Sequence, residues 1–336
     1  MRSVHLVIPD LFLPQQVAAE ACAGLVLPAL GTLLARAKTA PLPVESLEVW
    51  LCETFGVANQ ALAPITLRAD GMEPGAAYWL RADPVHLRLQ RDQLILQDGG
   101  LLTVAEAAQL CACLNAHFVA DGLRFFAPHP QRWYLQADNA PEMSTYSLAH
   151  VLGRDVHPYL PQGAGALRWH GVFNEIQMLL FEHPVNQARE TRGELPVNSV
   201  WLWGGGRAVG ELERPYAKVC GDSDLAAAFA QAAGIPYHSL PEDASRFVAG
   251  DDGDVLMVCE GLRSALRFGD LQAWRDGLQR FEQWCVQPLL EALRTGRIGR
   301  LSLEVPQSGA SRCFVLTRGT AWKLWQRPKP LARYAV

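Results

Sequence analysis

The sequence predicts an α/β protein whose main sheet is mostly parallel and covered by helices. The 336 residues are 49% hydrophobic and 19% charged, so a chain of this length can bury a substantial core. Strand-like apolar runs alternate with helical patterns along most of the chain, an order typical of parallel, covered sheets. Between residues 71 and 138 the pattern changes to a local hairpin, a helix and a further strand. We therefore predict a core domain at 1–70 plus 139–336 and an inserted α+β domain at 71–138.

The N-terminal elements fit the core domain. The run Val4–Ile8 is typical of a central strand buried on both faces, and Asp10 follows in the loop that ends it. Residues 15–37 have helical spacing with interruptions, and residues 44–56 form an amphipathic helix that ends at Gly56.

The inserted region has antiparallel character. Residues 85–97 alternate apolar and polar side chains around a central turn, which predicts a β-hairpin. Thr103 can cap a helix over 104–118, with Glu106 at the capping-box position. Arg132–Gln136 predicts another strand.

In the rest of the chain, helical and strand patterns alternate again. Helical spacing occurs at 166–182, 225–233 and 271–294, and strand patterns occur at 197–203, 254–259, 301–305 and 312–317. The last two strands are close enough in sequence to form a hairpin.

Composition argues against several classes of partner. The net charge of −4 and pI near 6.1 provide no basic excess for binding nucleic acid, and the densest basic stretch, 323–333, suggests a solvated tail. No apolar window reaches the length of a membrane span, and the N-terminus does not resemble a signal peptide. The eight cysteines are scattered without zinc-site spacing, so we predict free thiols and a cytoplasmic location.

One polar segment could bind an anion. The segment 183–193, which we predict to be a loop, brings together an imidazole, a carboxamide and two guanidiniums, from His183, Asn186, Arg189 and Arg192. Such a set could clamp phosphate or carboxylate. The alternative is a solvated connection in which Asn186 bonds its own backbone.

Two further candidate sites follow predicted strands. Gly204–Gly206 follows a strand and could approach an anion through backbone N–H groups, or could be a plain tight turn. Asp10 lies at the carboxyl end of the first strand, where ligands bind in parallel sheets, so it is a candidate metal ligand or base; the alternative is an Asx turn. No Asp-His, Asp-x-x-x-His or His-x-x-x-His pattern accompanies it.

Taken together, these segments resemble the archaeal-type branch of cofactor-independent phosphoglycerate mutases. That branch has a similar H-P-x-N-x-x-R, then a G-x-P-x-N, then a strand closed by a glycine loop. The matching residues here are His183, Pro184, Asn186, Arg189, Gly193, Pro196, Asn198 and Gly204–Gly206. The segments Ala82–Arg88, Glu106-Ala107 and Arg132–Leu135 fall where the family has its substrate-domain arginine, helix and hairpin strands. The resemblance implies an alkaline-phosphatase-like fold, with Asp10 at the place of the first metal-binding aspartate.

The departures from the family concern its catalytic groups. The family has a nucleophilic serine or threonine just before a leucine-rich helix, whereas Leu27–Leu34 offers only Thr32. The segment Glu260–Asp270 keeps the family's Gly-Asp pair but has arginines and leucines in place of a metal-binding Asp and His. Glu304–Ser308 stands where a later Asp-His is expected. With so few ligands, a pair of divalent cations should not bind tightly.

The leading hypothesis is therefore a degenerate relative that lacks the two-metal centre. It resembles a bacterial branch of the family sometimes described as regulatory proteins, and we expect it to bind a small phosphorylated or carboxylated metabolite in a regulatory role. The expected ligand-binding residues are Arg88, His183, Asn186, Arg189, Asn198, Gly204, Gly205, Gly206 and Arg207. Asp10 is expected to be vestigial, and no metal or other cofactor is expected.

Two alternatives stay open. One is an active metal-dependent 2,3-bisphosphoglycerate-independent phosphoglycerate mutase, or a phosphatase, that uses Mn or Zn with unorthodox ligands. The other is a pure interaction protein, with Trp201, Trp203, Trp274 and Trp284 at a partner surface rather than in the core. The sequence does not give the oligomeric state.

Overall fold

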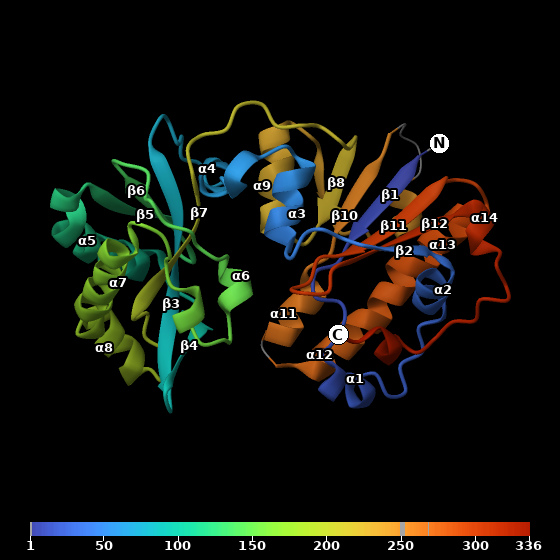
Figure 1. Cartoon of the computed structure of the whole chain (residues 1–336), viewed down its shortest axis with the longest axis horizontal. Coiled ribbons are helices and arrows are strands. Elements are labelled where there is room, and N and C mark those ends of the chain that lie inside the picture. The colour runs from blue at the N-terminus through green and yellow to red at the C-terminus, as the bar shows by residue number, and fades with distance from the viewer. Residues whose placement is uncertain (1, 249–252, 268) are drawn as a thin grey trace. The chain divides into compact units, whose positions relative to one another are not determined.

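A computed structural model describes residues 2–248, 253–267 and 269–336 of the chain. The chain divides into two compact units (Figure 1). The first comprises Met1–Phe55 and Glu213–Val336, and the second comprises Gly56–Leu212.

The first unit is built on a seven-stranded sheet of order β2-β12-β11-β1-β10-β8-β9. Its strands are β1 (Ser3–Val7), β2 (Lys38–Pro41), β8 (Lys218–Gly221), β9 (Tyr237–Ser239), β10 (Val255–Val258), β11 (Arg300–Val305) and β12 (Arg312–Thr317). β1 pairs in parallel with β10 on one side and with β11 on the other, and only β12 runs antiparallel to its neighbours. The carboxyl ends of the parallel strands therefore meet along one edge of the sheet.

Helices cover both faces of this sheet (Figure 1). They are α1 (Gln15–Ala21), α2 (Pro28–Arg36), α3 (Leu47–Thr54), α9 (Asp224–Ala233), α10 (Ala244–Phe247), α11 (Gly261–Arg267), α12 (Leu271–Phe281), α13 (Gln287–Arg294) and α14 (Arg318–Ala321). A π-helical turn, Glu282–Val286, joins α12 to α13. Val4 and Leu6 of β1 are fully buried in the core formed with α2, α12 and α13.

The opposite face of β1 carries a polar anchor. Nε1 of Trp50 on α3 donates to Oε2 of Glu304 on β11 at 2.6 Å, and Nδ1 of His5 lies 3.6 Å from Oε1 of the same carboxylate. Burial by itself raises the pKa of Glu304, but the bonds from His5 and Trp50 outweigh it and lower that pKa below its ordinary value. The anchor fixes α3 against the centre of the sheet.

The second unit has a five-stranded sheet in which β3 is the common partner. β3 (Tyr78–Gln90) pairs antiparallel with β4 (Gln93–Asp98), β6 (Arg132–Ala137) and β7 (Ser199–Gly206), and β6 pairs with β5 (Leu123–His129). The helices are α4 (Ala63–Ala69), α5 (Val104–Phe118), α6 (Leu148–Val151), α7 (Ala166–Phe181) and α8 (Pro184–Thr191). In Figure 1, α5, α7 and α8 lie together on one side of this sheet.

Most predicted elements are confirmed, including the two hairpins and the Thr103–Glu106 capping box. The second unit, however, extends beyond the insertion expected at 71–138. It reaches residue 212 because β7, far along the chain, completes the sheet by pairing with β3.

Two local predictions were wrong. Residues 183–193 are mostly the helix α8 rather than a loop, because Pro184 at its first position favours helical φ and His183 caps it. Gly204–Gly206 ends the strand β7 rather than forming a loop after it.

The basic stretch 323–333 is solvated, as predicted, with Arg327, Lys329 and Arg333 exposed. The chain that follows it is anchored to the core: the Tyr334 ring stacks on Phe12, 5.9 Å between centroids, and the Val336 amide donates to the Leu13 carbonyl at 3.1 Å.

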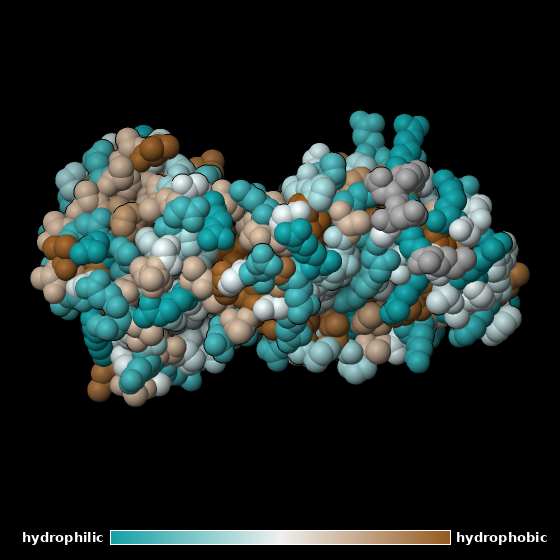
Figure 2. All heavy atoms as spheres, turned by 90° about the horizontal axis from the view of Figure 1, so that it is seen from above, coloured by the Kyte–Doolittle hydropathy of each residue, from teal (hydrophilic) through white to brown (hydrophobic). Residues whose placement is uncertain are grey.

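All eight cysteines are free thiols, as predicted. Burial raises the pKa of Cys259 and Cys285 well above the ordinary value, so these thiols are unreactive. Within the part of the chain that the structure describes, no helix has both the length and the apolar character needed to cross a membrane. On the face shown in Figure 2, hydrophobic side chains surface in separate groups among hydrophilic ones.

We predict that Trp50→Phe destabilises the protein by about 1.5–3 kcal/mol at neutral pH, because it removes a hydrogen bond to an ionised carboxylate that is only partly exposed. The pKa of Glu304 is lower in the folded than in the unfolded protein, so ionised Glu304 adds to the free energy of unfolding at any pH above its unfolded-state pKa. This contribution disappears as the pH falls through the folded-state pKa. The difference between variant and wild type should therefore shrink in acid. Urea unfolding from about pH 7 to pH 4 measures it. Trp325→Phe, at a side chain that is 76% exposed, is the control. If Trp50→Phe lost the same stability at every pH, the hydrogen bond to ionised Glu304 would not be the cause.

Candidate functional site

The carboxyl edge of the seven-stranded sheet gathers acidic side chains. Asp10 follows β1, Glu260 follows β10, and Glu48 reaches the same place from α3. Ligands of open α/β sheets bind at this edge, so we take it as the candidate site.

A buried arginine occupies the centre of these carboxylates. Nε of Arg263 lies 2.8 Å from Oδ2 of Asp10, and its Nη1 lies 3.2 Å from Oε1 of Glu260 and 3.7 Å from Oε1 of Glu48. The Arg263 side chain is 7% exposed. Burial alone lowers the pKa of Arg263, but Glu48, Asp10 and Glu260 outweigh it and raise that pKa. We call these four residues the arginine–carboxylate cluster.

Backbone geometry holds the cluster in place. Asp222, at the end of β8, accepts from the amides of Glu260 at 2.6 Å and Gly261 at 2.9 Å, which fixes the start of α11. Asp10 adopts a left-handed conformation with φ of 54°, which Asp tolerates better than most residues. Its amide donates to the Pro306 carbonyl at 3.2 Å.

The donor set does not resemble a metal centre. Among the described residues, no group of three or more His, Cys, Asp or Glu side chains is arranged to hold a metal ion. The family's metal-binding Asp and His are expected in the segment Glu260–Asp270, and that segment supplies Arg263 to the cluster instead. Phe268 of the same segment lies outside the described residues.

A second buried charge occupies the N-terminus of α2, the helix that the family resemblance places after a nucleophile. Oε1 of Glu282 accepts from the Ala29 amide at 2.5 Å, and Oε2 accepts from the Leu30 amide at 2.9 Å. Burial raises the pKa of this carboxyl, although the two amide bonds act in the opposite direction. Thr32 is 7% exposed and its hydroxyl donates to the Pro28 carbonyl at 2.7 Å, so it does not present a nucleophile at the helix start.

The two most prominent predicted anion-binding residues are buried and internally bonded. The Asn186 amide nitrogen donates to the carbonyls of Leu180 and Val197 at 2.7 and 2.8 Å, and its oxygen accepts from the Val197 amide at 2.9 Å. Arg189, 1% exposed, donates to the carbonyls of Leu195, Leu101 and Gly99 and lies 3.5 Å from Glu106. Through these hydrogen bonds both side chains hold α8 against neighbouring segments of their own unit.

Two other candidates also have structural partners. Nδ1 of His183 accepts from the Val185 amide at 3.2 Å as the cap of α8. The Asn198 side chain pairs with both backbone groups of Leu87, at 2.7 and 2.9 Å. The structure therefore brings His183, Asn186 and Asn198 to the ends of α8 and β7, where each holds backbone in place.

The three glycines at the end of β7 allow close packing. A Cβ on Gly206 would lie 2.2 Å from the Cβ of Ala61, and a Cβ on Gly205 would lie 2.6 Å from the hydroxyl of Tyr78. Gly204 has a left-handed φ of 62°. The space beside them is filled by protein, so the structure gives these glycines a packing role.

Arg88 and Arg207 differ from the other candidates because their side chains are exposed. A guanidinium nitrogen of Arg207 donates to the Ala76 carbonyl. Trp201 and Trp274 are buried and Trp284 packs edge-on against Phe281, consistent with the core alternative for the tryptophans.

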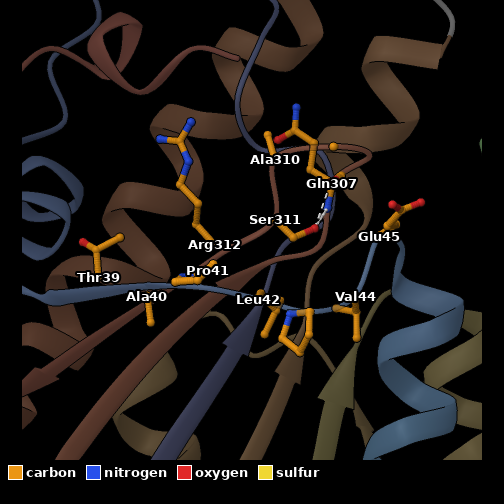
Figure 3. Close-up of a pocket in the computed structure, with 12 residues that line it drawn as sticks. Thr39, Ala40, Pro41, Leu42, Val44, Glu45, Gln307, Ala310, Ser311 and Arg312 are labelled. Atoms are coloured by element: carbon orange, nitrogen blue, oxygen red, sulfur yellow. Dashed lines mark hydrogen bonds between the residues drawn. The ribbon is translucent and has the colours of Figure 1, made fainter.

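A separate cavity of about 580 Å³ opens at the carboxyl ends of β2 and β11. Figure 3 shows Thr39 and Arg312 on one side of it and Glu45 on the other. The Arg312 guanidinium carbon lies 5.1 Å from the centre of the Phe12 ring, a cation–π contact. Sequence reasoning missed this cavity because it is lined by β2 with the segment after it and by the turn between β11 and β12, some 270 residues apart.

The chain has relatives among curated phosphoglycerate mutases. It is 29% identical over 150 residues to a probable 2,3-bisphosphoglycerate-independent phosphoglycerate mutase of Geobacter sulfurreducens, which covers 44% of this chain and 38% of the relative. It is 26% identical over 172 residues to the 2,3-bisphosphoglycerate-independent phosphoglycerate mutase of Methanothrix thermoacetophila, covering 46% and 44%. The matches thus span less than half the length of these relatives, and no family model matches the chain.

Two solved structures are similar over nearly the whole chain. The PH0037 protein of Pyrococcus horikoshii matches with a TM-score of 0.54 at 11% identity, covering 98% of this chain and 91% of that one. The cofactor-independent phosphoglycerate mutase of Thermoplasma acidophilum has a TM-score of 0.48 at 13% identity, covering 100% and 95%. The predicted α/β class with a mostly parallel, helix-covered main sheet is confirmed, and the fold is shared with the PH0037 protein. The curated relatives support a phosphoglycerate-mutase-like relationship.

We predict that Gly206→Ala destabilises the protein by about 1–3 kcal/mol, because the added methyl group overlaps Ala61. Gly210→Ala is the matched control, since a Cβ there meets no atom within 4 Å. Thermal unfolding of both variants measures the difference. If Gly206→Ala instead leaves stability unchanged and weakens phosphate binding, the packing role is wrong.

Proposed function

We propose that this chain is a phosphoglycerate-mutase-like protein that does not run two-metal phosphoryl transfer and that binds a small phosphorylated or carboxylated metabolite in a regulatory role. The observation that carries the proposal is the arginine–carboxylate cluster at the carboxyl edge of the main sheet. A cytoplasmic location and the lack of nucleic-acid or membrane partners stay predictions.

The argument against two-metal chemistry is electrostatic. Two divalent cations need several anionic ligands directed at them, since they repel each other strongly. Asp10, Glu48 and Glu260 are instead directed at the Arg263 guanidinium, which brings a permanent positive charge. A cation approaching Asp10 would have to compete with a charge that is covalently attached and already bonded.

The start of α2 also lacks a nucleophile, whether or not a metal binds. Phosphoryl transfer through a covalent intermediate needs an activated hydroxyl beside the phosphate. The start of α2, where the resemblance places that hydroxyl, has Leu27 as N-cap with no side-chain cap, and the Glu282 carboxylate on its first amides. A resident anion at this helix N-terminus also disfavours a second anion.

A binding function rests on two cationic groups, one exposed and one half-buried beside a cavity. Arg88 keeps an exposed guanidinium on β3, and Arg312 lines the cavity at the ends of β2 and β11. Guanidinium groups bind phosphate and carboxylate through paired N–H donors. Asn186 and Arg189 would support such a site only by holding the fold of their unit.

The first test of the proposal is metal content and turnover. We expect purified protein to contain no stoichiometric metal and to show no mutase or phosphatase activity with added manganese, zinc or magnesium. Elemental analysis and a coupled phosphoglycerate mutase assay measure both. Stoichiometric metal, or metal-dependent turnover, would establish the enzymatic alternative in its place.

The second test concerns Arg263. We predict that Arg263→Ala destabilises the protein by about 3–5 kcal/mol, because it leaves three carboxylates converging without their central cation. Arg263→Lys keeps the charge and should lose less. Arg246→Ala, which removes an 88% exposed partner of Asp243, is the control and should change stability by about 0.5 kcal/mol or less. A neutral result for Arg263→Ala would show that the cluster does not depend on its guanidinium.

The third test is ligand binding. Calorimetry with 2- and 3-phosphoglycerate and with inorganic phosphate should detect binding at millimolar concentration or below. Loss of a guanidinium contact should weaken binding about tenfold or more, so Arg88→Ala and Arg312→Ala identify which unit holds the ligand. Absence of binding to all three probes at millimolar concentration would rule out this metabolite class.

A further inference from the structure

Helix α7 presents an apolar stripe to solvent, interrupted at its middle by the exposed Asn174. Leu167, Met178 and Phe181 are 87%, 76% and 75% exposed. They lie 11 and 14 residues apart, which is close to three and four whole helical turns, so they share one side of the helix. The opposite side, with Trp169 and Ile176 among its members, is buried against the rest of the unit. A solvent-facing stripe of this kind on a well-packed helix is a sign of a docking surface.

The stripe has a shape that fits its own reversed copy. Gly171, near the N-terminal half, leaves a notch, and Met178, near the C-terminal half, is a flexible projection. Leu167 and Phe181 stand at the two ends. Because small residues let helices approach closely, the Met178 of a reversed helix would fill the Gly171 notch.

The charges beside the stripe follow the same symmetry. Arg168 and Glu182 are both exposed and flank the stripe on one side, at its opposite ends. A parallel two-fold pair would set this flank against the partner's other flank, so Arg168 would not meet Glu182. A reversed copy sets each arginine against a glutamate. Glu175, close to the middle, is already paired with His117 at 2.6 Å, which limits repulsion at the centre.

We propose that α7 is a homodimerisation surface, on which two copies of this chain pack their α7 helices antiparallel about a two-fold axis near Asn174. A two-fold axis brings the same patch of both subunits together, and therefore needs the self-complementarity that the stripe has. One four-turn helix per subunit is a small interface, so the dimer forms in the micromolar range.

A charge-swap series tests the antiparallel arrangement. Wild-type protein should pass from monomer to dimer as concentration rises through the micromolar range in sedimentation velocity. Arg168→Glu and Glu182→Arg should each weaken the dimer about tenfold or more, since each places like charges together. The double variant, Arg168→Glu with Glu182→Arg, should restore it, because both pairs are then opposite in charge again.

Controls separate the interface from general surface effects. Met178→Asp should abolish the dimer, whereas Leu89→Asp, at a 73% exposed position on β3 of the same unit, should not change it. Circular dichroism checks that each variant is folded. Wild-type protein that stays monomeric at high micromolar concentration would overturn the proposal. So would a double variant that does not recover, or a dimer unaffected by Met178→Asp.

Discussion

The buried guanidinium of Arg263 is the interaction on which the candidate site depends. Parallel strands end along one edge of the sheet, so the loops that follow them bring Asp10 and Glu260 together, and α3 adds Glu48. Carboxylates gathered in this way repel one another and need a cation. Metal ions and arginine meet that need differently, since a guanidinium offers directed N–H donors but no open coordination position.

Glu282 supplies a negative charge at α2, where the first amides of the helix have no partner within the helix. The first amides of a helix need acceptors, and a substrate phosphate or a side-chain carboxylate can provide them. Here the carboxylate comes from a π-helical turn more than 250 residues away, 2.5 and 2.9 Å from two amides of α2. In this unit the Arg263 guanidinium thus pairs with the gathered carboxylates, and the Glu282 carboxylate accepts from the first amides of α2.

The sequence predicted regular elements well, because periodicity and capping are local. Thr103 with Glu106 and the strand Val4–Ile8 are examples. It failed where one residue type serves two purposes: the amide of Asn186 can bind a ligand, or can bond the backbone of Leu180 and Val197, as it does. The arginines of the 260–270 segment indicated a departure from a metal site, but the partners of Arg263, Asp10 and Glu48, lie more than 200 residues away and could not be assigned from spacing.

Arginine and a metal ion, as alternative partners for gathered carboxylates, also differ in what they make the fold respond to. A bound metal stabilises a protein in proportion to the logarithm of its free concentration, so a metal site links stability to the surroundings. The Arg263 charge is attached to the chain, and its raised pKa keeps it protonated at every physiological pH. The positive charge at the carboxyl edge is therefore constant across physiological pH. Among the other groups that a ligand or partner could reach, Arg88 and the apolar stripe of α7 are exposed, and Arg312 is half-buried beside a cavity.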